Sequence, residues 1–95
     1  MLPILVSIFL GLFAGNAWPH FARGITRERY PSALGNGPVV NFVVGWVGLV
    51  VSVAIAWWAW PALTADPLPS ALGAALGVLL IGLFHAGPGA FGRKD

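Results

Sequence analysis

The chain has 95 residues, of which 58% are hydrophobic and only 8% are charged. Soluble domains carry about 25% charged residues, so this composition excludes an ordinary soluble domain and indicates an integral membrane protein. The sequence has no cysteine, which excludes disulfides, thiolate metal sites and a nucleophilic Cys.

The first apolar segment runs from Leu2 to Trp18. Its length lies at the lower edge of the roughly 17–25 residues with which a helix spans a bilayer. A secretory signal is the alternative interpretation, but signals carry positive charge before their apolar stretch, and Met1-Leu2-Pro3 has none. The small residues at 14–17 are the one feature that favours a signal. We therefore expect a retained transmembrane helix.

The second segment, Val39 to Pro61, contains no charged residue and is the clearest span. Trp57, Trp58 and Trp60 gather at its far end, where indole rings favour the headgroup level of a bilayer. Proline lacks the N–H that continues a helix, so we expect this span to end at Pro61.

The third segment runs from Ser70 to Ala86. Its glycines would weaken a soluble helix, but glycine is more frequent in transmembrane helices and the helix forms in lipid regardless. Pro67 and Pro69 precede this span and predict a short, stiff outer connection. Ser70 is expected to cap the helix.

The distribution of positive charge predicts the orientation. The connection between the first two spans carries Arg23, Arg27 and Arg29, and the C-terminal tail carries Arg93 and Lys94. Basic residues in short connections favour the cytoplasm, and three spans place both clusters on one side. The sequence thus predicts one all-α integral membrane domain over residues 1–95, with helices at about 2–18, 39–61 and 70–86. Its N-terminus is expected outside and its C-terminus in the cytoplasm, in the inner membrane of a bacterium.

Small residues recur at a spacing of four in all three spans. Lipid competes equally for large apolar side chains, so small residues that let backbones approach become the specific contacts between helices. Packing within one monomer and a seam between copies are both open, and a homo-oligomer or larger membrane complex is expected. The candidate packing residues are Gly11, Gly15, Gly48, Gly73 and Gly77.

The connection from Pro19 to Pro38 is long for so small a protein and is the region most expected to carry function. Aromatic residues alternate there with Arg23, Arg27 and Arg29, as in a segment that lies in the interface and contacts lipid headgroups. The positive-inside rule alone also explains these arginines. A contact with a partner or an anion is the sharper alternative.

Polar residues cluster at a similar depth near the inner ends of the three spans: Asn16, His20, Asn41 and His85. Polar groups inside a membrane are expensive and usually face protein or water. They are expected to form hydrogen bonds between helices. Convergence on one inner-leaflet site is the alternative.

No enzyme, cofactor or metal site is expected. A metal site needs three or four ligands, and two histidines without cysteine or a nearby carboxylate fall short. No Ser-His-acid set or carboxylate pair can be assembled. Nucleic acid is not an expected partner, because the topology already explains the basic residues.

Several short motifs lie between about residues 16 and 48: Asn16, Pro19-His20-Phe21, Gly24-Ile25, Pro31-Ser32, Val40-Asn41 and Gly45. Together they resemble a family of small uncharacterised bacterial multi-span membrane proteins that has a PHFxxGI-like stretch. The resemblance implies that this connection and the start of the second span form a shared element. It implies no activity.

Two functions follow as hypotheses. The first is a small accessory or structural membrane protein that packs through glycine-rich helix faces into a homo-oligomer or larger complex, with membrane lipids as partners. The second is one subunit of a homo-oligomeric channel or transporter whose polar residues face a wet inner vestibule.

Overall fold

The computed structural model describes residues 2–87, which form three α-helices: α1 (Leu2–Ile25), α2 (Pro38–Ala65) and α3 (Pro67–Ala86). Each helix is long and apolar enough to cross a membrane. The expectation of an all-helical chain with three such helices is confirmed. The basic residues Arg93 and Lys94 lie outside the described residues.

Helix α1 is longer than predicted. It continues past Trp18 and Pro19 to Ile25, so the predicted end at residue 18 is wrong. Proline removes only one backbone hydrogen bond, and neighbouring helices can hold the helix beyond it. Here the extra turns are held against α2, because the backbone of Phe21 lies where a Cβ on Gly45 would stand. The connection between α1 and α2 is therefore confined to residues 26–37.

Helix α2 begins at Pro38, with Gly37 as its N-cap, as proline at the first helical position favours. The predicted end at Pro61 is wrong, since the helix runs through this proline to Ala65. The hydroxyl of Thr64 donates to the carbonyl of Trp60 at 2.8 Å and satisfies an acceptor near the helix end.

Asp66 alone separates α2 from α3. Pro67 is the first residue of α3, so the short connection is present but the predicted helix start at Ser70 is wrong. Ser70 is not the cap, because the helix begins at Pro67 with Asp66 as its N-cap, and Ser70 lies within the first turn. Its hydroxyl is buried without a hydrogen-bond partner in the part of the chain that the structure describes.

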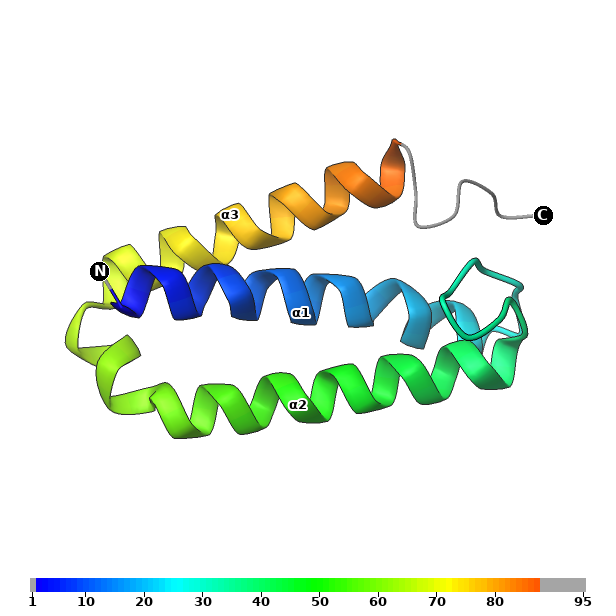
Figure 1. Ribbon diagram of the computed structural model, residues 1–95, viewed down its shortest axis with the longest axis horizontal. Coiled ribbons are helices and arrows are strands. Elements are labelled where there is room, and N and C mark those ends of the chain that lie inside the picture. Colours follow the sequence, from blue (N-terminus) through cyan, green and yellow to red (C-terminus); the bar gives the residue numbers. More distant parts are fainter. Residues whose placement is uncertain (1, 88–95) are drawn as a thin grey trace.

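The three helices form a layer in which α1 lies between α2 and α3 (Figure 1). Helix α1 packs along both neighbours, whereas α2 and α3 scarcely contact each other. The connection 26–37 and the end of α3 lie at one end of the layer, and the junction between α2 and α3, where Asp66 stands, lies at the other (Figure 1). Helix α1 therefore takes part in both of the large interfaces between helices.

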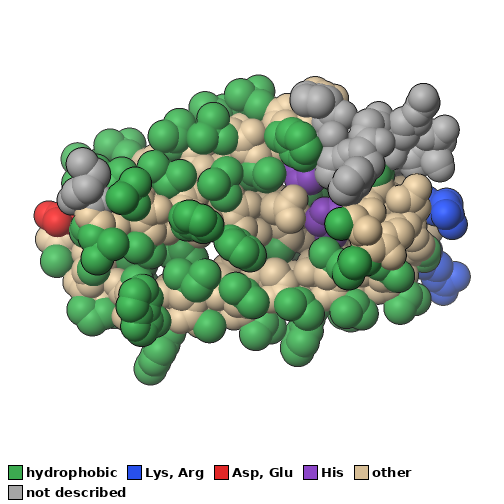
Figure 2. Space-filling model, viewed as in Figure 1, with side chains coloured by type: hydrophobic (Ala, Val, Ile, Leu, Met, Phe, Trp, Pro, Cys, Tyr) green, Lys and Arg blue, Asp and Glu red, His purple; other side chains and the backbone are tan. Residues whose placement is uncertain are grey.

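The buried positions are small or polar, and the large apolar side chains point outward (Figure 2). The only buried hydrophobic residues among those described are Ala17 and Ala59. A soluble protein shows the opposite distribution, because water drives large apolar side chains inside. This arrangement is the one expected where hydrocarbon is the solvent.

Glycine allows α1 and α3 to approach until their backbones touch. A Cβ built on Gly77 would lie 2.8 Å from the backbone nitrogen of Leu12 and 2.9 Å from the Cα of Gly11. A Cβ on Gly11 would in turn meet the carbonyl of Ala74. These two positions therefore exclude any side chain.

We expect Gly77→Ala to lower the free energy of unfolding by about 1–3 kcal/mol, since the added methyl group overpacks the α1–α3 contact. Gly82→Ala is the matched control on the same helix, because no atom lies within 4 Å of a Cβ at that position. It should leave stability unchanged or raise it by up to about 1 kcal/mol. Unfolding in mixed detergent followed by circular dichroism measures both variants, and equal effects would contradict the packing described.

Candidate functional site

The inner polar residues meet where α1 ends, α2 begins and α3 ends. Asn16 and His20 lie one helical turn apart on α1 and so share one face. Asn41 lies in the first turn of α2, and His85 in the last turn of α3. The polar cluster, defined as these four residues, thus joins all three helices.

Asn41 is the centre of the cluster and is 0% exposed. Its side-chain nitrogen donates to the carbonyl of Tyr30 at 2.8 Å and to that of Gly37 at 2.9 Å. Both partners are acceptors only, so they fix the amide with its oxygen toward His20. The Asn41 side chain therefore ties the connection, the start of α2 and α1 together.

The orientation of Asn41 also sets the tautomer of His20. The Nδ1 of His20 lies 2.6 Å from the Oδ1 of Asn41, which can only accept, so Nδ1 carries a proton and donates it. In the neutral imidazole the lone pair then belongs to Nε2. A second bond of the same kind joins the Nε2 of His85 to the Oδ1 of Asn16 at 2.8 Å.

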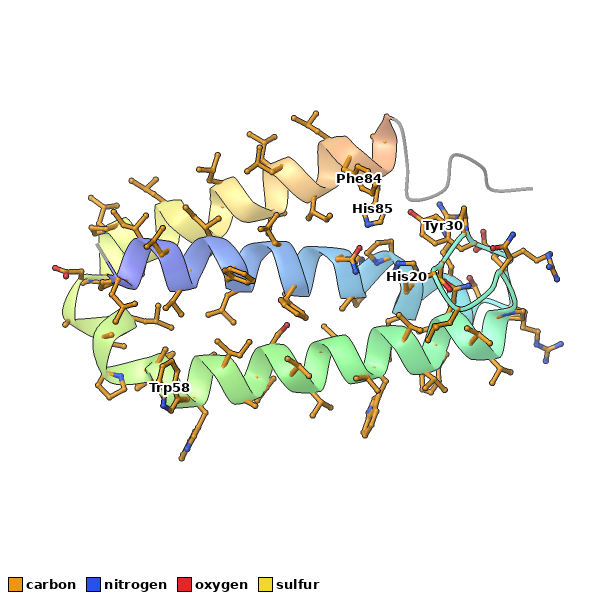
Figure 3. All side chains as sticks on the ribbon, in the orientation of Figure 1. His20, Tyr30, Trp58, Phe84 and His85 are labelled. Carbon is orange, nitrogen blue, oxygen red and sulfur yellow. The ribbon has the colours of Figure 1, made fainter. Side chains whose placement is uncertain are left out.

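Three rings surround this point, and Figure 3 shows His20, Tyr30 and His85 side by side. The His20 ring centroid lies 5.3 Å from that of Tyr30 and 5.8 Å from that of His85, both edge to face. His20 itself is 4% exposed. The rings shield its bonds from solvent, which strengthens hydrogen bonds in a low-dielectric surrounding.

The two histidines each keep one ring nitrogen without a hydrogen bond to the described residues. These nitrogens can accept a proton or a hydrogen bond. Within residues 2–87, no group of three or more His, Cys, Asp or Glu side chains is placed to hold a metal ion. The chemistry that this geometry supports is hydrogen bonding between helices.

The connection packs onto the cluster through Tyr30. Its backbone nitrogen donates to the carbonyl of Asn36 at 3.1 Å, which closes the connection on itself. Arg23 lies over the Tyr30 ring, with its Cζ 5.5 Å from the centroid, and donates to Glu28 at 2.6 Å. A cation above an aromatic face and a charge-assisted hydrogen bond both order this segment.

The structure thus brings all four predicted polar residues together, and both interpretations of them coexist: they converge, and they bond between helices. Sequence reasoning missed the part played by Tyr30 and Gly37, whose backbone carbonyls hold Asn41. The Gly-Asn-Gly turn before Pro38 was a signal for Gly37 alone, because it places this carbonyl directly before the first turn of α2. The predicted packing glycines all lie between helices of one chain: Gly11, Gly15, Gly48, Gly73 and Gly77.

The fold and this cluster define the class only as an all-helical protein with three helices able to cross a membrane. Comparison of the chain with protein-family models, with curated proteins and with solved structures gives no match. The resemblance suggested by the PHFxxGI-like stretch stays a prediction.

We expect Asn41→Leu to destabilise the protein by about 3 kcal/mol or more, because it leaves a buried His20 N–H and the Tyr30 carbonyl without partners. Asn16→Leu is the matched control, since it removes one bond between helices at a partly exposed position. It should cost about 1 kcal/mol. Reversible unfolding in detergent measures both, and a larger loss for Asn16→Leu would contradict the central place of Asn41.

Proposed function

We propose that the protein is a small accessory or structural integral membrane protein of the bacterial cytoplasmic membrane, with its N-terminus outside and its C-terminus in the cytoplasm. The distribution of charge supports this orientation. Arg23, Arg27 and Arg29 lie at or just after the end of α1, and Asp66 lies between α2 and α3. Figure 2 shows basic side chains at one end of the layer and an acidic side chain at the opposite end. Basic residues favour the cytoplasmic side.

The tryptophans support the position of the opposite end in the membrane. Trp57, Trp58 and Trp60 are 83%, 75% and 61% exposed near the Asp66 end of α2. Figure 3 shows Trp58 at this end, far from the polar cluster. Exposed indoles at one level of a span are typical of the interface between hydrocarbon and headgroups. The start of α2, at Pro38, then lies at the cytoplasmic interface.

The burial of Asn41 is the observation that favours a structural role over a channel. A polar vestibule between subunits needs side chains that face out of the monomer toward water. Asn41 is 0% exposed and His20 is 4% exposed, and the hydrogen bond between these two side chains is made within one chain. The polar cluster therefore joins α1 to α2 and α1 to α3 by hydrogen bonds within one chain.

Association with other chains would use the outer faces of the layer, because the glycine faces are occupied by contacts within the monomer. An apolar groove on α2, lined by Val53, Ala56, Trp57, Trp60 and Pro61, is one such surface. A homo-oligomer or a larger membrane complex is the proposed assembly.

Single cysteines test the orientation cleanly, because the natural sequence has none. We expect Ala33→Cys in the connection to react with a membrane-impermeant maleimide only after cells are opened. Ala65→Cys, at the exposed opposite end, should react in intact cells whose outer membrane is permeabilised. The reverse pattern would contradict the proposed orientation.

Native mass spectrometry of protein released gently from its own membrane tests the proposed role. We expect a defined homo-oligomer or a stoichiometric complex with a foreign membrane subunit. An isolated monomer carrying only lipid would contradict assembly through the outer faces.

A further inference from the structure

The end of α1 holds an arginine in a conformation that favours glycine. The backbone nitrogen of Glu28 donates to the carbonyl of Arg23 at 2.9 Å, and that of Arg27 donates to Gly24 at 3.1 Å. This pair of bonds is the Schellman ending of a helix, whose left-handed residue is usually glycine. Here that residue is Arg27, with a φ of 60°.

Arg27 is the only residue with a side chain at a positive φ in the described part of the chain. The left-handed conformation brings Cβ close to the following carbonyl oxygen, so a side chain at this position opposes stability. Strain of this kind persists where the surrounding structure holds it, and it gathers at functional positions. Arg27 therefore carries its guanidinium group at a position that glycine would fill with less strain.

The three arginines of this segment are in different situations. Arg23 is occupied, because it donates to one oxygen of Glu28 at 2.6 Å and lies over Tyr30. The other oxygen of Glu28 accepts from the hydroxyl of Thr26 at 2.6 Å, so this carboxylate is held toward α1. Arg23 thus orders the segment from within.

Arg27 and Arg29 are both exposed, and within residues 2–87 no hydrogen bond or ion pair engages either guanidinium group. Among the described residues, Arg27 and Arg29 therefore carry two unpaired positive charges, two positions apart, just beyond the end of α1. Trp18 and Ile25, seven residues apart on one face of α1, are 59% and 58% exposed at the same end. Positive charge beside an apolar helix face complements a molecule with an anionic head and an apolar tail.

We propose that Arg27 and Arg29 form a binding site for the phosphate of an anionic phospholipid, whose acyl chains lie along α1. The site rests on the proposed function, because it requires the helices to lie in a bilayer. Guanidinium groups bind phosphate oxygens in bidentate geometry, which selects arginine at such positions. Arg23 is a positioning residue that holds the turn through Glu28.

Arg27→Gly provides the test, since it removes the guanidinium group and relieves the strained position. The full-length protein is placed in nanodiscs of phosphatidylcholine and phosphatidylglycerol in equal amounts. Lipids retained by the protein are then counted by native mass spectrometry. We expect the natural protein to retain more phosphatidylglycerol than phosphatidylcholine. This enrichment should be about fivefold lower in Arg27→Gly and lower by a similar factor in Arg29→Gln.

The unfolding temperature separates binding from folding. Arg27→Gly should unfold at the same temperature as the natural protein or higher, because glycine is favoured at this position. Arg27→Lys keeps the charge and the strain, and it should retain part of the enrichment. Unchanged enrichment in Arg27→Gly would overturn the proposal.

A soluble phosphate compound distinguishes a lipid site from a simple anion site. We expect phosphatidylglycerol added to the protein in detergent to raise the unfolding temperature and glycerol 3-phosphate to leave it unchanged. An equal rise with both compounds would overturn the lipid assignment. The nanodisc measurement does not depend on orientation in the cell. Reversed labelling of Ala33→Cys would therefore refute the proposed orientation without bearing on the lipid site, whereas unchanged lipid enrichment would refute the lipid site alone.

Discussion

The close approach of α1 to both neighbours is the constraint on which the rest of the structure depends. Lipid tails satisfy large apolar side chains as well as protein does, so they give these side chains no reason to gather inside. Small residues let the backbones meet, as where Gly11 faces the carbonyl of Ala74. The exterior is then left for leucine, valine and tryptophan, which suits hydrocarbon and leaves broad outer faces for lipid or a partner.

The two ends of the layer are held in different ways. At one end, Asp66 joins α2 to α3 directly, and the prolines around it restrict the chain. At the other, a longer connection must be fixed in place, and Asn41 does this by bonding to Tyr30 and to His20. Burial makes each of these bonds costly to break. The polar cluster therefore determines where the arginine-bearing turn lies relative to the helices.

Hydropathy is sufficient to predict the three helices, but not their ends. In the sequence, Pro19 and Pro61 suggest the ends of helices. In the structure each proline removes one hydrogen bond but the helix continues past it, because contacts with neighbouring helices or the rest of the helix hold it. The depth of Asn16, His20, Asn41 and His85 follows from their positions along the spans. Their angular convergence does not, because it depends on how the helices rotate against one another. The carbonyl of Tyr30 leaves no pattern of side chains to find.

Solid-state NMR of the protein in lipid bilayers, with ¹⁵N-labelled histidine, tests most directly whether the polar cluster is closed within one monomer. The proton of His20 is expected on Nδ1, with slow exchange against water. Dilution with unlabelled protein should leave the correlation between the His20 and His85 rings unchanged, because both rings belong to one chain. A His20 ring in fast exchange with water, or a His20–His85 correlation that disappears on dilution, would contradict the closed cluster and favour a wet surface between subunits.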